Sequence, residues 1–528
     1  MSILVVDVGT SGVRAAVVHP DATVHHVHYR EVLPESPAPG FVQFDAAAMA
    51  AGALDVARAA LEAGGPVEAV GIANQRASTI VWDRATGVPV GPGVGWQDQR
   101  TAGMCLELQG RGIRVAPNVS ATKVAFLLDM ADPERERDLC FGTVDSWIAW
   151  TLSGGALHIT DTTNAGLTGL LHADASGWSS QVLDVLRIPS SVLPTIVDST
   201  GVVGEASELP GAPPIAGLAG DQQASLVGQG CTRPGLAKIT FGTGGMLDLC
   251  IGATRPAFEA RGPGGCFPIV AWRRGGRLTW GVEAFMLTAG QAVEWLRDDL
   301  GLIESAAASD AVAASCADTG DVWFVPALLG LGTPEWDFGA RGTLLGLTRG
   351  SGRPEVVRAV LEGIAHRGAD LVEAAEADGA HAIATLRVDA SSRPWPTQPS
   401  ARSRCRRCPT PRRSGPRSWQ AWPSAPGPAR TTSPPPGRLG RWSTRCTSPT
   451  ATAGGRRATA REVGCPSCRP STSEAEGYMP VTRPTVFPCG SLNSARVGPS
   501  GTSMGPITVL PPSFATFSSA AAMSSTWM

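Results

Sequence analysis

Three short segments combine residue types that bind phosphate or move a proton. The first is Asp7–Arg14, the second is Ala219–Gln223, and the third is Gly242–Gly244. Glycine and threonine turns present backbone N–H groups and hydroxyls to an anion. In the first segment Asp7 adds a carboxylate for a metal and Arg14 adds a cation for phosphate. Either glycine turn alone could be an ordinary tight turn. Phosphate chemistry is indicated by the two turns together with Asp7 and Arg14.

Asp221 follows an apolar run and is flanked by Gly220 and two glutamines, with no cation beside it in the sequence. An aspartate in this place is commonly a helix cap or a turn former. It is also placed to act as a general base at the end of a strand. The local sequence leaves both interpretations open.

The surrounding elements must position these segments. Apolar runs on either side of each glycine-rich turn predict two β-hairpins, at residues 3–18 and 237–249. Their similarity suggests two related α/β lobes. The remaining patterns predict helices at 45–63, 147–152, 284–300 and 354–378, strands at 67–73, 79–82 and 385–389, and a strand-loop at 215–223.

The composition allows substantial cores. The chain has 528 residues, of which 43% are hydrophobic and 17% charged, with a formal net charge of -2. This length suits two or three domains and excludes a fibrous or wholly disordered protein. No apolar run is long enough to span a bilayer, and the twelve cysteines lack regular spacing. We therefore expect a soluble, cytoplasmic protein with reduced thiols and no membrane partner.

The composition changes abruptly after Asp389. Residues 390–528 hold 18 of the 44 basic residues, 3 of the 46 acidic residues and 22 of the 43 prolines. Such a segment cannot bury enough apolar surface to offset the entropy of ordering it, so we predict a disordered, low-complexity tail. The switch at a single residue is what reading a GC-rich gene in the wrong frame would produce, and we infer a frameshift.

The sequence of the tail suggests two other interpretations, a zinc site and a nucleic-acid-binding segment. The pairs Cys405/Cys408 and Cys465/Cys468 have the internal spacing of zinc ligands, but the gap between the pairs far exceeds that of a zinc ribbon. The arginines are not organised with aromatic or helical elements as in a nucleic-acid-binding module. We therefore expect no nucleic-acid partner.

Four blocks follow one another along the chain: Gly71–Arg76, Phe141–Trp147, Gly217–Gln223 and Leu345–Gly350. Their sequences and their order resemble those of the FGGY carbohydrate kinase family, most closely its glycerol-phosphorylating branch. The resemblance runs from about residue 3 to 389. It implies an α/β fold of two ribonuclease-H-like lobes, as in actin and hexokinase, with an interlobe cleft. Residues 1–233 would form the substrate domain, residues 234–389 an incomplete nucleotide domain, and residues 390–528 the tail.

The resemblance also implies roles for individual residues. Asp221 matches the general base that takes the proton from a substrate hydroxyl as it attacks the γ-phosphate of ATP. Asp7 matches the acid that holds Mg²⁺. Residues that match nucleotide contacts are Thr10, Ser11, Gly12 and Arg14 in the first phosphate loop, Thr243 in the second, and Gly290 and Glu294, the last in place of a more usual glutamine.

On the substrate side, the matches are Arg76, Trp96, Asn118, Gln222 and Met246, together with Asp221 itself. The ordinary alternatives for the first two are a surface salt bridge and a core tryptophan. Three positions depart from the glycerol-phosphorylating pattern. Ala77 replaces a glutamate, Asn118 a tyrosine and Met246 a phenylalanine. Because a lost carboxylate and phenol remove hydrogen-bonding groups, we predict a preference for a larger polyol or a ketose.

The expected function is ATP-dependent phosphorylation of a polyol or sugar hydroxyl, with ATP and Mg²⁺ as cofactors and a small polyol or sugar as partner. Two alternatives stay open: a non-catalytic, polyol-binding regulatory relative, or an inactive frameshifted product. The adenosine-contacting segment that the family has after the 387–389 strand has no counterpart here. The sequence leaves the exact acceptor, allosteric control and homo-oligomer formation open.

Overall fold

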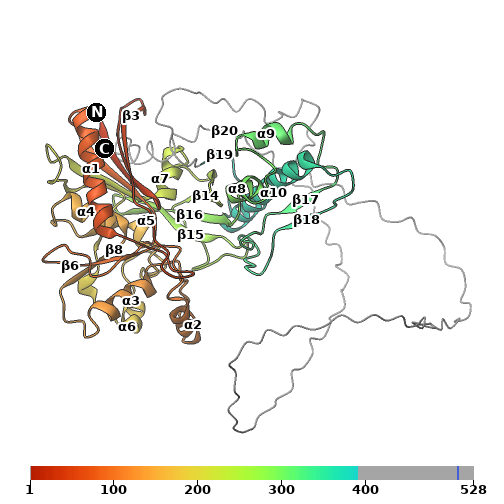
Figure 1. The fold of residues 1–528 in the computed structure, drawn as a ribbon. Coiled ribbons are helices and arrows are strands. Elements are labelled where there is room, and N and C mark those ends of the chain that lie inside the picture. Colours follow the sequence, from red (N-terminus) through yellow and green to blue (C-terminus); the bar gives the residue numbers. More distant parts are fainter. Residues whose placement is uncertain (1, 391–507, 510–528) are drawn as a thin grey trace, which may run out of the picture. The chain divides into compact units, whose positions relative to one another are not determined.

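The computed structural model describes residues 2–390 and 508–509, in which two six-stranded sheets dominate (Figure 1). The first sheet has the order β11-β12-β5-β1-β2-β3. Strand β1 is antiparallel to β2 and parallel to β5, which is parallel to β12. The bounds are β1 Ile3–Val8, β2 Gly12–Val18, β3 Val24–Glu31, β5 Ala69–Asn74, β11 Thr200–Glu205 and β12 Pro214–Gly220.

The second sheet has the order β15-β16-β14-β13-β19-β20. Here too a hairpin, β13–β14, is antiparallel, and the first hairpin strand has a parallel neighbour, β19. The two sheets therefore share a hairpin-plus-parallel-strand arrangement, as the repeated sequence pattern predicts. The bounds are β13 Leu236–Phe241, β14 Gly245–Gly252, β15 Phe267–Arg274, β16 Arg277–Met286, β19 Thr385–Ala390 and β20 Thr508–Val509.

Helix α1 (Ala46–Gly64) covers β2 and β3 of the first sheet. Asp45 is its N-cap and accepts a hydrogen bond from Ala48 N at 2.9 Å. The helix ends before Gly65, whose φ of 79° and ψ of -170° are a conformation that only glycine adopts without strain. Its alanine-rich inner face belongs to a core built with strands β1, β2 and β5.

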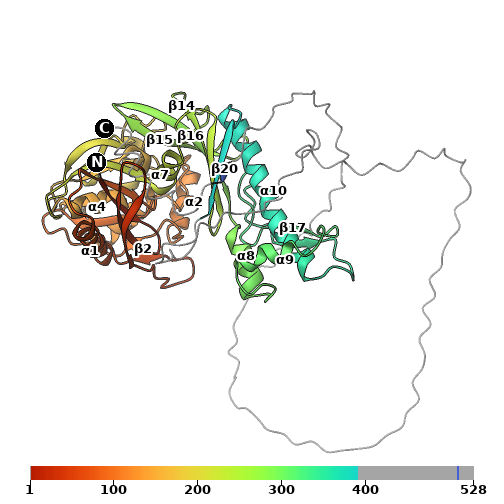
Figure 2. The same ribbon diagram turned by 90° about the horizontal axis from the view of Figure 1, so that it is seen from above.

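Helix α10 (Arg353–Gly379) packs against β14 and β16 of the second sheet. Its N-terminus carries Pro354 in the first turn, and Glu355 accepts a hydrogen bond from Gly352 N at 2.9 Å. The same helix contacts α8 (Gly290–Asp298), α9 (Ala308–Ala313) and β17 (Trp323–Val325), which gather beside it in both views (Figures 1 and 2).

The other elements complete the two sheet layers and a subdomain around residues 80–192. They are β4 Gln43–Phe44, β6 Ile80–Asp83, β7 Gly93–Val94, α2 Ala102–Gly110, α3 Ala121–Ala131, β8 Leu139–Gly142, α4 Val144–Leu152, β9 Ile159–Asp161, α5 Thr162–Ala165, α6 Ser180–Leu186, the 3₁₀ turn Ser190–Val192, β10 Thr195–Val197, α7 Asp221–Gly228 and β18 Thr343–Leu345. Among the described residues, none of the helices is both long and apolar enough to cross a membrane.

Most predicted elements are confirmed, and three predictions need correction. The helix predicted at 284–300 is wrong, because residues 277–286 form β16 and the helix begins only at Gly290. A central strand buried on both faces is almost continuously apolar and is easily mistaken for a helix. Asp221 begins helix α7 rather than lying in a loop. Within the predicted tail, residues 508–509 form a short strand, while its other residues lie outside the described part of the chain.

Candidate functional site

Three neighbouring parallel strands, β1, β5 and β12, end at the same edge of the first sheet. Asp7 lies near the end of β1, Arg76 follows β5, and Asp221 follows β12. In the register Asp7 pairs with Ala73, and Ala73 pairs with Ala219. The carboxyl ends of parallel strands are the usual location of binding sites in open α/β sheets. Residues that are distant in the sequence are therefore brought to one edge.

Asp221 has a cationic neighbour that the sequence did not indicate. The distance from Arg76 Nε to Asp221 Oδ1 is 3.3 Å, and the Arg76 side chain is only 10% exposed. Gly220 permits this approach, because a Cβ there would lie 2.6 Å from Arg76 Cγ. Asp221 Oδ1 also accepts a hydrogen bond from Gln222 N at 2.8 Å. With 35% of its side chain exposed, Asp221 remains accessible to a ligand.

A row of charged residues crosses the second sheet beside this aspartate. Lys238 on β13 is directly opposite Asp248 on β14, and Asp248 is directly opposite Glu283 on β16. Lys238 Nζ lies 2.8 Å from Asp248 Oδ2, and both side chains are fully buried. Glu283 Oε2 lies 2.7 Å from Arg76 Nη1. Lys238 also donates a hydrogen bond to Gln222 Oε1. Two contacts thus link the second sheet to the residues around Asp221.

The first glycine turn connects β1 and β2. Gly9 N donates to Gly12 O at 3.0 Å, which closes the turn around Thr10 and Ser11. A Cβ on Gly12 would lie 2.6 Å from Arg30 O, so this position needs glycine. Arg14 on β2 returns toward Asp7, with 3.2 Å between Arg14 Nη1 and Asp7 Oδ2.

The second glycine turn, Gly242–Gly244, connects β13 and β14 and packs against the start of α8. Gly290 N donates to Gly242 O at 2.8 Å, and Ala289 N donates to Thr243 O at 2.9 Å. A Cβ on Gly290 would lie 2.5 Å from Gly242 O. The structure thus brings the Gly242–Gly244 turn and the start of α8 together and leaves Thr243 exposed.

Of the other candidate residues, Trp96 contacts the first turn, whereas Asn118 and Glu294 are exposed. Trp96 Nε1 donates to Thr10 Oγ1 at 3.4 Å, which joins the predicted pocket wall to the first turn. Met246 lies on β14, two residues before Asp248. Asn118 is exposed in the turn before α3, and Glu294 is exposed on α8. No hydrogen bond or ion pair within residues 2–390 joins Asn118 to Arg76 or Asp221.

Burial controls the proton affinity of the two aspartates. Burial raises the pKa of Asp221, while the nearby Arg76 charge lowers it. Burial also raises the pKa of Asp7; Arg14 lowers it and Asp221 raises it further. The two carboxyls therefore influence each other through space. Carboxyl groups with shifted pKa values beside cations are typical of a site that transfers protons or binds phosphate.

The donor set around Asp7 suits Mg²⁺. This ion is commonly held by one or two carboxylates plus waters and substrate phosphates rather than by an all-protein cage. Asp7 is 3% exposed, and the Asp221 carboxyl is its electrostatic neighbour. Within the described residues, no group of three or more His, Cys, Asp or Glu side chains is arranged to hold a metal. A site completed by phosphate oxygens agrees with both observations.

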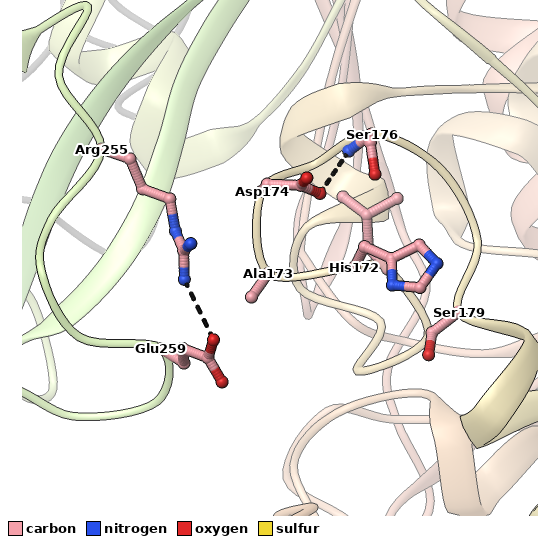
Figure 3. Close-up of a pocket in the computed structure, with 8 residues that line it drawn as sticks. His172, Ala173, Asp174, Ser176, Ser179, Arg255 and Glu259 are labelled. Atoms are coloured by element: carbon pink, nitrogen blue, oxygen red, sulfur yellow. Dashed lines mark hydrogen bonds and ion pairs between the residues drawn. The ribbon is translucent and has the colours of Figure 1, made fainter.

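An open pocket of about 480 Å³ lies elsewhere, between the 171–179 loop and the segment after β14 (Figure 3). Asp174 accepts a hydrogen bond from Ser176 N at 3.0 Å on one side, and Arg255 pairs with Glu259 at 3.6 Å on the other. Asp174, Arg255 and Glu259 already have partners at its edge, and none of the candidate residues lines it. This pocket is therefore not the candidate functional site.

The two sheets and the turns at their edges define an α/β protein of the sugar-kinase fold. The N-terminal domain model of the FGGY family of carbohydrate kinases matches residues 2–228, and the C-terminal domain model matches residues 237–389. The chain therefore belongs to the FGGY family of carbohydrate kinases.

Individual relatives agree with this assignment. The chain is 43% identical over 408 residues to a glycerol kinase of Trichlorobacter lovleyi, covering 73% of this chain and 81% of that protein. It is 44% identical over 407 residues to a glycerol kinase of Aromatoleum aromaticum, with the same coverage. The crystal structure of Plasmodium falciparum glycerol kinase with ADP matches with a TM-score of 0.68 and 25% identity, covering 74% of this chain and 81% of that one.

Lys238, Asp248 and Glu283 were missed by the sequence analysis. A signal for two of them was present, since each of Lys238 and Asp248 interrupts an apolar strand of the predicted hairpin. A charged side chain inside an apolar strand is expected to be buried, and a buried charge needs a partner of opposite charge. Glu283 could not be found in this way, because its segment was predicted as a helix rather than as the neighbouring strand.

Proposed function

We propose that this kinase transfers the γ-phosphate of ATP to a hydroxyl of a polyol or sugar, with Asp221 as the general base. The observation that carries the proposal is the Asp221 carboxylate, accessible at the end of β12 and 3.3 Å from Arg76. Asp221 would take the hydroxyl proton as the oxygen attacks phosphorus. Phosphoryl transfer depends mainly on positioning and on charge stabilisation, which the remaining residues supply.

On the acceptor side, we infer that Arg76 and Gln222 orient hydroxyl groups beside Asp221 and that Trp96 forms an apolar wall. Asn118 and Met246 would complete the pocket. Ala77 is buried directly after Arg76 and has no side-chain group to bind a hydroxyl. Two relatives are glycerol kinases, which supports a polyol as acceptor. We propose that the absence of a carboxylate at position 77 moves the preference from glycerol toward a larger polyol or a ketose.

On the nucleotide side, Thr10, Ser11, Gly12 and Arg14 would hold the phosphates together with Thr243, while Gly290 and Glu294 would lie along the nucleoside. The ADP-bound relative supports a nucleotide as ligand. Asp7 would hold Mg²⁺, which when bound neutralises charge on the phosphates. Arg14 adds a fixed cation next to Asp7.

The assignment of domains follows from these roles. We propose that residues 1–233 form the acceptor domain and that residues 234–389 form the nucleotide domain, with residues 390–528 read out of frame. The family models support the first two segments, since the second match ends at residue 389. A cytoplasmic location is proposed because ATP is supplied there.

The test is a panel of acceptors, comprising glycerol, tetritols, pentitols and ketopentoses, assayed with ATP and Mg²⁺ by ADP release. We expect ADP release that depends on the acceptor, with the highest kcat/KM on an acceptor larger than glycerol. A strong preference for glycerol would contradict the altered specificity alone. ATP turnover that no acceptor stimulates would contradict the proposed function.

A further inference from the structure

The buried charges on the second sheet raise a physical question. Asp248 and Glu283 lie directly opposite each other on adjacent strands, and like charges in that relation destabilise a sheet. Their exposed fractions are 0% and 2%. Burying two neighbouring carboxyl groups is costly unless each has a compensating partner.

The compensating partners connect this pair to the proposed acceptor site. Glu283 contacts Arg76, which also contacts Asp221. Asp248 contacts Lys238, which donates to Gln222. Each acid therefore holds one cation, and each cation holds one residue at the start of α7. The two chains of contacts are parallel and both cross from the second sheet to the first.

We propose that Glu283 is a positioning residue that holds Arg76 beside Asp221, and that Asp248 holds Lys238 beside Gln222 in the same way. This inference rests on the proposed function and names residues of the same site. Arg76 has three acidic neighbours, Glu283, Asp221 and Asp248. Glu283 holds the Arg76 guanidinium from the side of the second sheet, so that Arg76 does not close fully onto Asp221 and Asp221 keeps its affinity for a proton.

The placement also connects the acceptor site to the nucleotide turn. Lys238 and Asp248 lie on the two strands of the β13–β14 hairpin, whose tip is the Gly242–Gly244 turn. A shift of this hairpin therefore moves the groups that orient Gln222. Glu283 lies on β16, paired with β14 along the same row.

Burial and the neighbouring charges act on the protonation of Glu283. Burial raises the pKa of Glu283 to about 8, with Arg76 lowering it and Asp248 raising it. The charged groups that act on Glu283 are Arg76 after β5 and Asp248 on β14, and its neighbour on β15 is the uncharged Phe267.

The test compares Glu283→Gln with the wild type in the full chain. Gln keeps the size of the side chain but offers Arg76 one oxygen acceptor in place of the two oxygens of the carboxyl group. We expect kcat to fall about 10- to 100-fold, as for a misplaced catalytic group, with KM for ATP changed less than about twofold. The acid limb of the kcat/KM profile should move to lower pH, because Arg76 then pairs with Asp221 alone.

The second acid is tested with Asp248→Asn. This variant should raise KM for the acceptor, because Lys238 would no longer be held beside Gln222.

Glu362→Gln is the matched control, since Glu362 forms an ion pair with Arg358 on α10 at 2.8 Å. It should leave both the rates and the acid limb unchanged. A Glu283→Gln enzyme with a lower melting temperature but an unmoved acid limb would show a purely structural role and overturn the proposal.

A crystal structure of Glu283→Gln gives a second readout that does not need turnover. We expect the Arg76 guanidinium to leave position 283 and close onto Asp221; an unchanged Arg76 would also overturn the proposal. If the wild type phosphorylates no acceptor, the proposed function fails, and the position of Arg76 in the variant still decides the inference.

Discussion

A carboxylate that works as a base must be ionised before the reaction and must still accept a proton during it. At Asp221 two opposing effects meet this requirement. Burial raises its pKa and disfavours the anion, whereas Arg76 at 3.3 Å lowers the pKa and favours the anion. The sequence around Asp221 contains no cation, so only the fold brings this second effect to the site.

Replacing Asp221 by asparagine tests its role directly. We expect Asp221→Asn to lower kcat by about 10²- to 10⁴-fold, because the amide cannot accept the hydroxyl proton. The measurement is ADP release with the best acceptor, with folding checked by thermal unfolding. Asp184→Asn, at an exposed position on α6, is the control and should keep wild-type rates. Equal rates for Asp221→Asn and the control would remove Asp221 from the mechanism.

Position 77 tests the acceptor preference. Ala77 is 6% exposed and has a left-handed φ of 60°, a backbone conformation that is unfavourable for alanine and glutamate alike. We expect Ala77→Glu to increase the ratio of kcat/KM on glycerol to kcat/KM on the preferred larger acceptor by about tenfold, since a carboxylate can bind a hydroxyl of a small triol. Parallel kinetics on both acceptors measure the ratio. No change in it would mean that residue 77 does not contact the acceptor.

At the scale of elements, the second glycine turn depends on helix α8. The helix begins where Gly290 N bonds Gly242 O, and there is no room for a side chain between them. The orientation of the turn is therefore fixed by the helix start rather than by the turn residues alone.

Gly290→Ala should disturb this contact. Its Cβ would lie 2.5 Å from a backbone oxygen, which cannot rotate away. We expect a loss of about 1–3 kcal/mol in the free energy of unfolding and a higher KM for ATP, measured by thermal unfolding and steady-state kinetics. Gly103→Ala on α2 is the matched control, because its Cβ meets nothing within 4 Å. We expect it to stabilise the helix by roughly 0.5–1 kcal/mol. Equal effects of the two variants would contradict the packing argument.

The sequence predicted the elements that carry strong local signals. Both hairpins, helix 45–63, helix 354–378 and strand 385–389 were confirmed, because glycine turns, an aspartate cap and a long apolar face identify them. The nucleotide-binding roles expected for Thr243 and Gly290 from the family resemblance stay predictions. Glu283 was missed, since its strand is buried on both faces and lacks alternation. The Arg76–Asp221 pair could not be predicted from spacing, because it depends on the parallel pairing of β5 with β12.

For the whole molecule, buried acids make stability depend on pH. Glu283 has an ordinary pKa of 4.5, raised by burial to about 8 in the folded protein. Between these values the folded state binds more protons than the unfolded state, so the free energy of unfolding falls as pH rises. Asp145, raised by burial to about 7, acts in the same direction. His158, whose pKa burial lowers to about 4, acts in the opposite direction below its ordinary value of 6.5.

Because these contributions overlap, the test compares Glu283→Gln with the wild type. The melting temperature of the variant minus that of the wild type should increase between pH 5 and pH 8. The slope in the free energy of unfolding should reach at most about 1.4 kcal/mol per pH unit. Thermal unfolding across a buffer series, with Glu362→Gln as reference, measures it. A difference that is constant with pH would mean that Glu283 is ionised in both states.

The reading frame after residue 389 can be checked at the level of the gene. We expect resequencing of the 3′ half to reveal an insertion or deletion near codon 390, because the family match ends at residue 389. Restoring the frame should extend the match and increase kcat/KM for ATP. An intact frame in the gene would refute the frameshift.

Strand β19 has a consequence for handling the protein in solution. It has six residues, and on the side away from β13 only Arg387 and Val388 pair with described residues, those of β20. No other described residue pairs with the main-chain amides and carbonyls along this margin, and such groups are the ones that a strand of another molecule pairs with. We expect light scattering to grow with protein concentration. A substitution to arginine or proline at this margin should suppress the growth, which would identify β19 as the point where self-association begins.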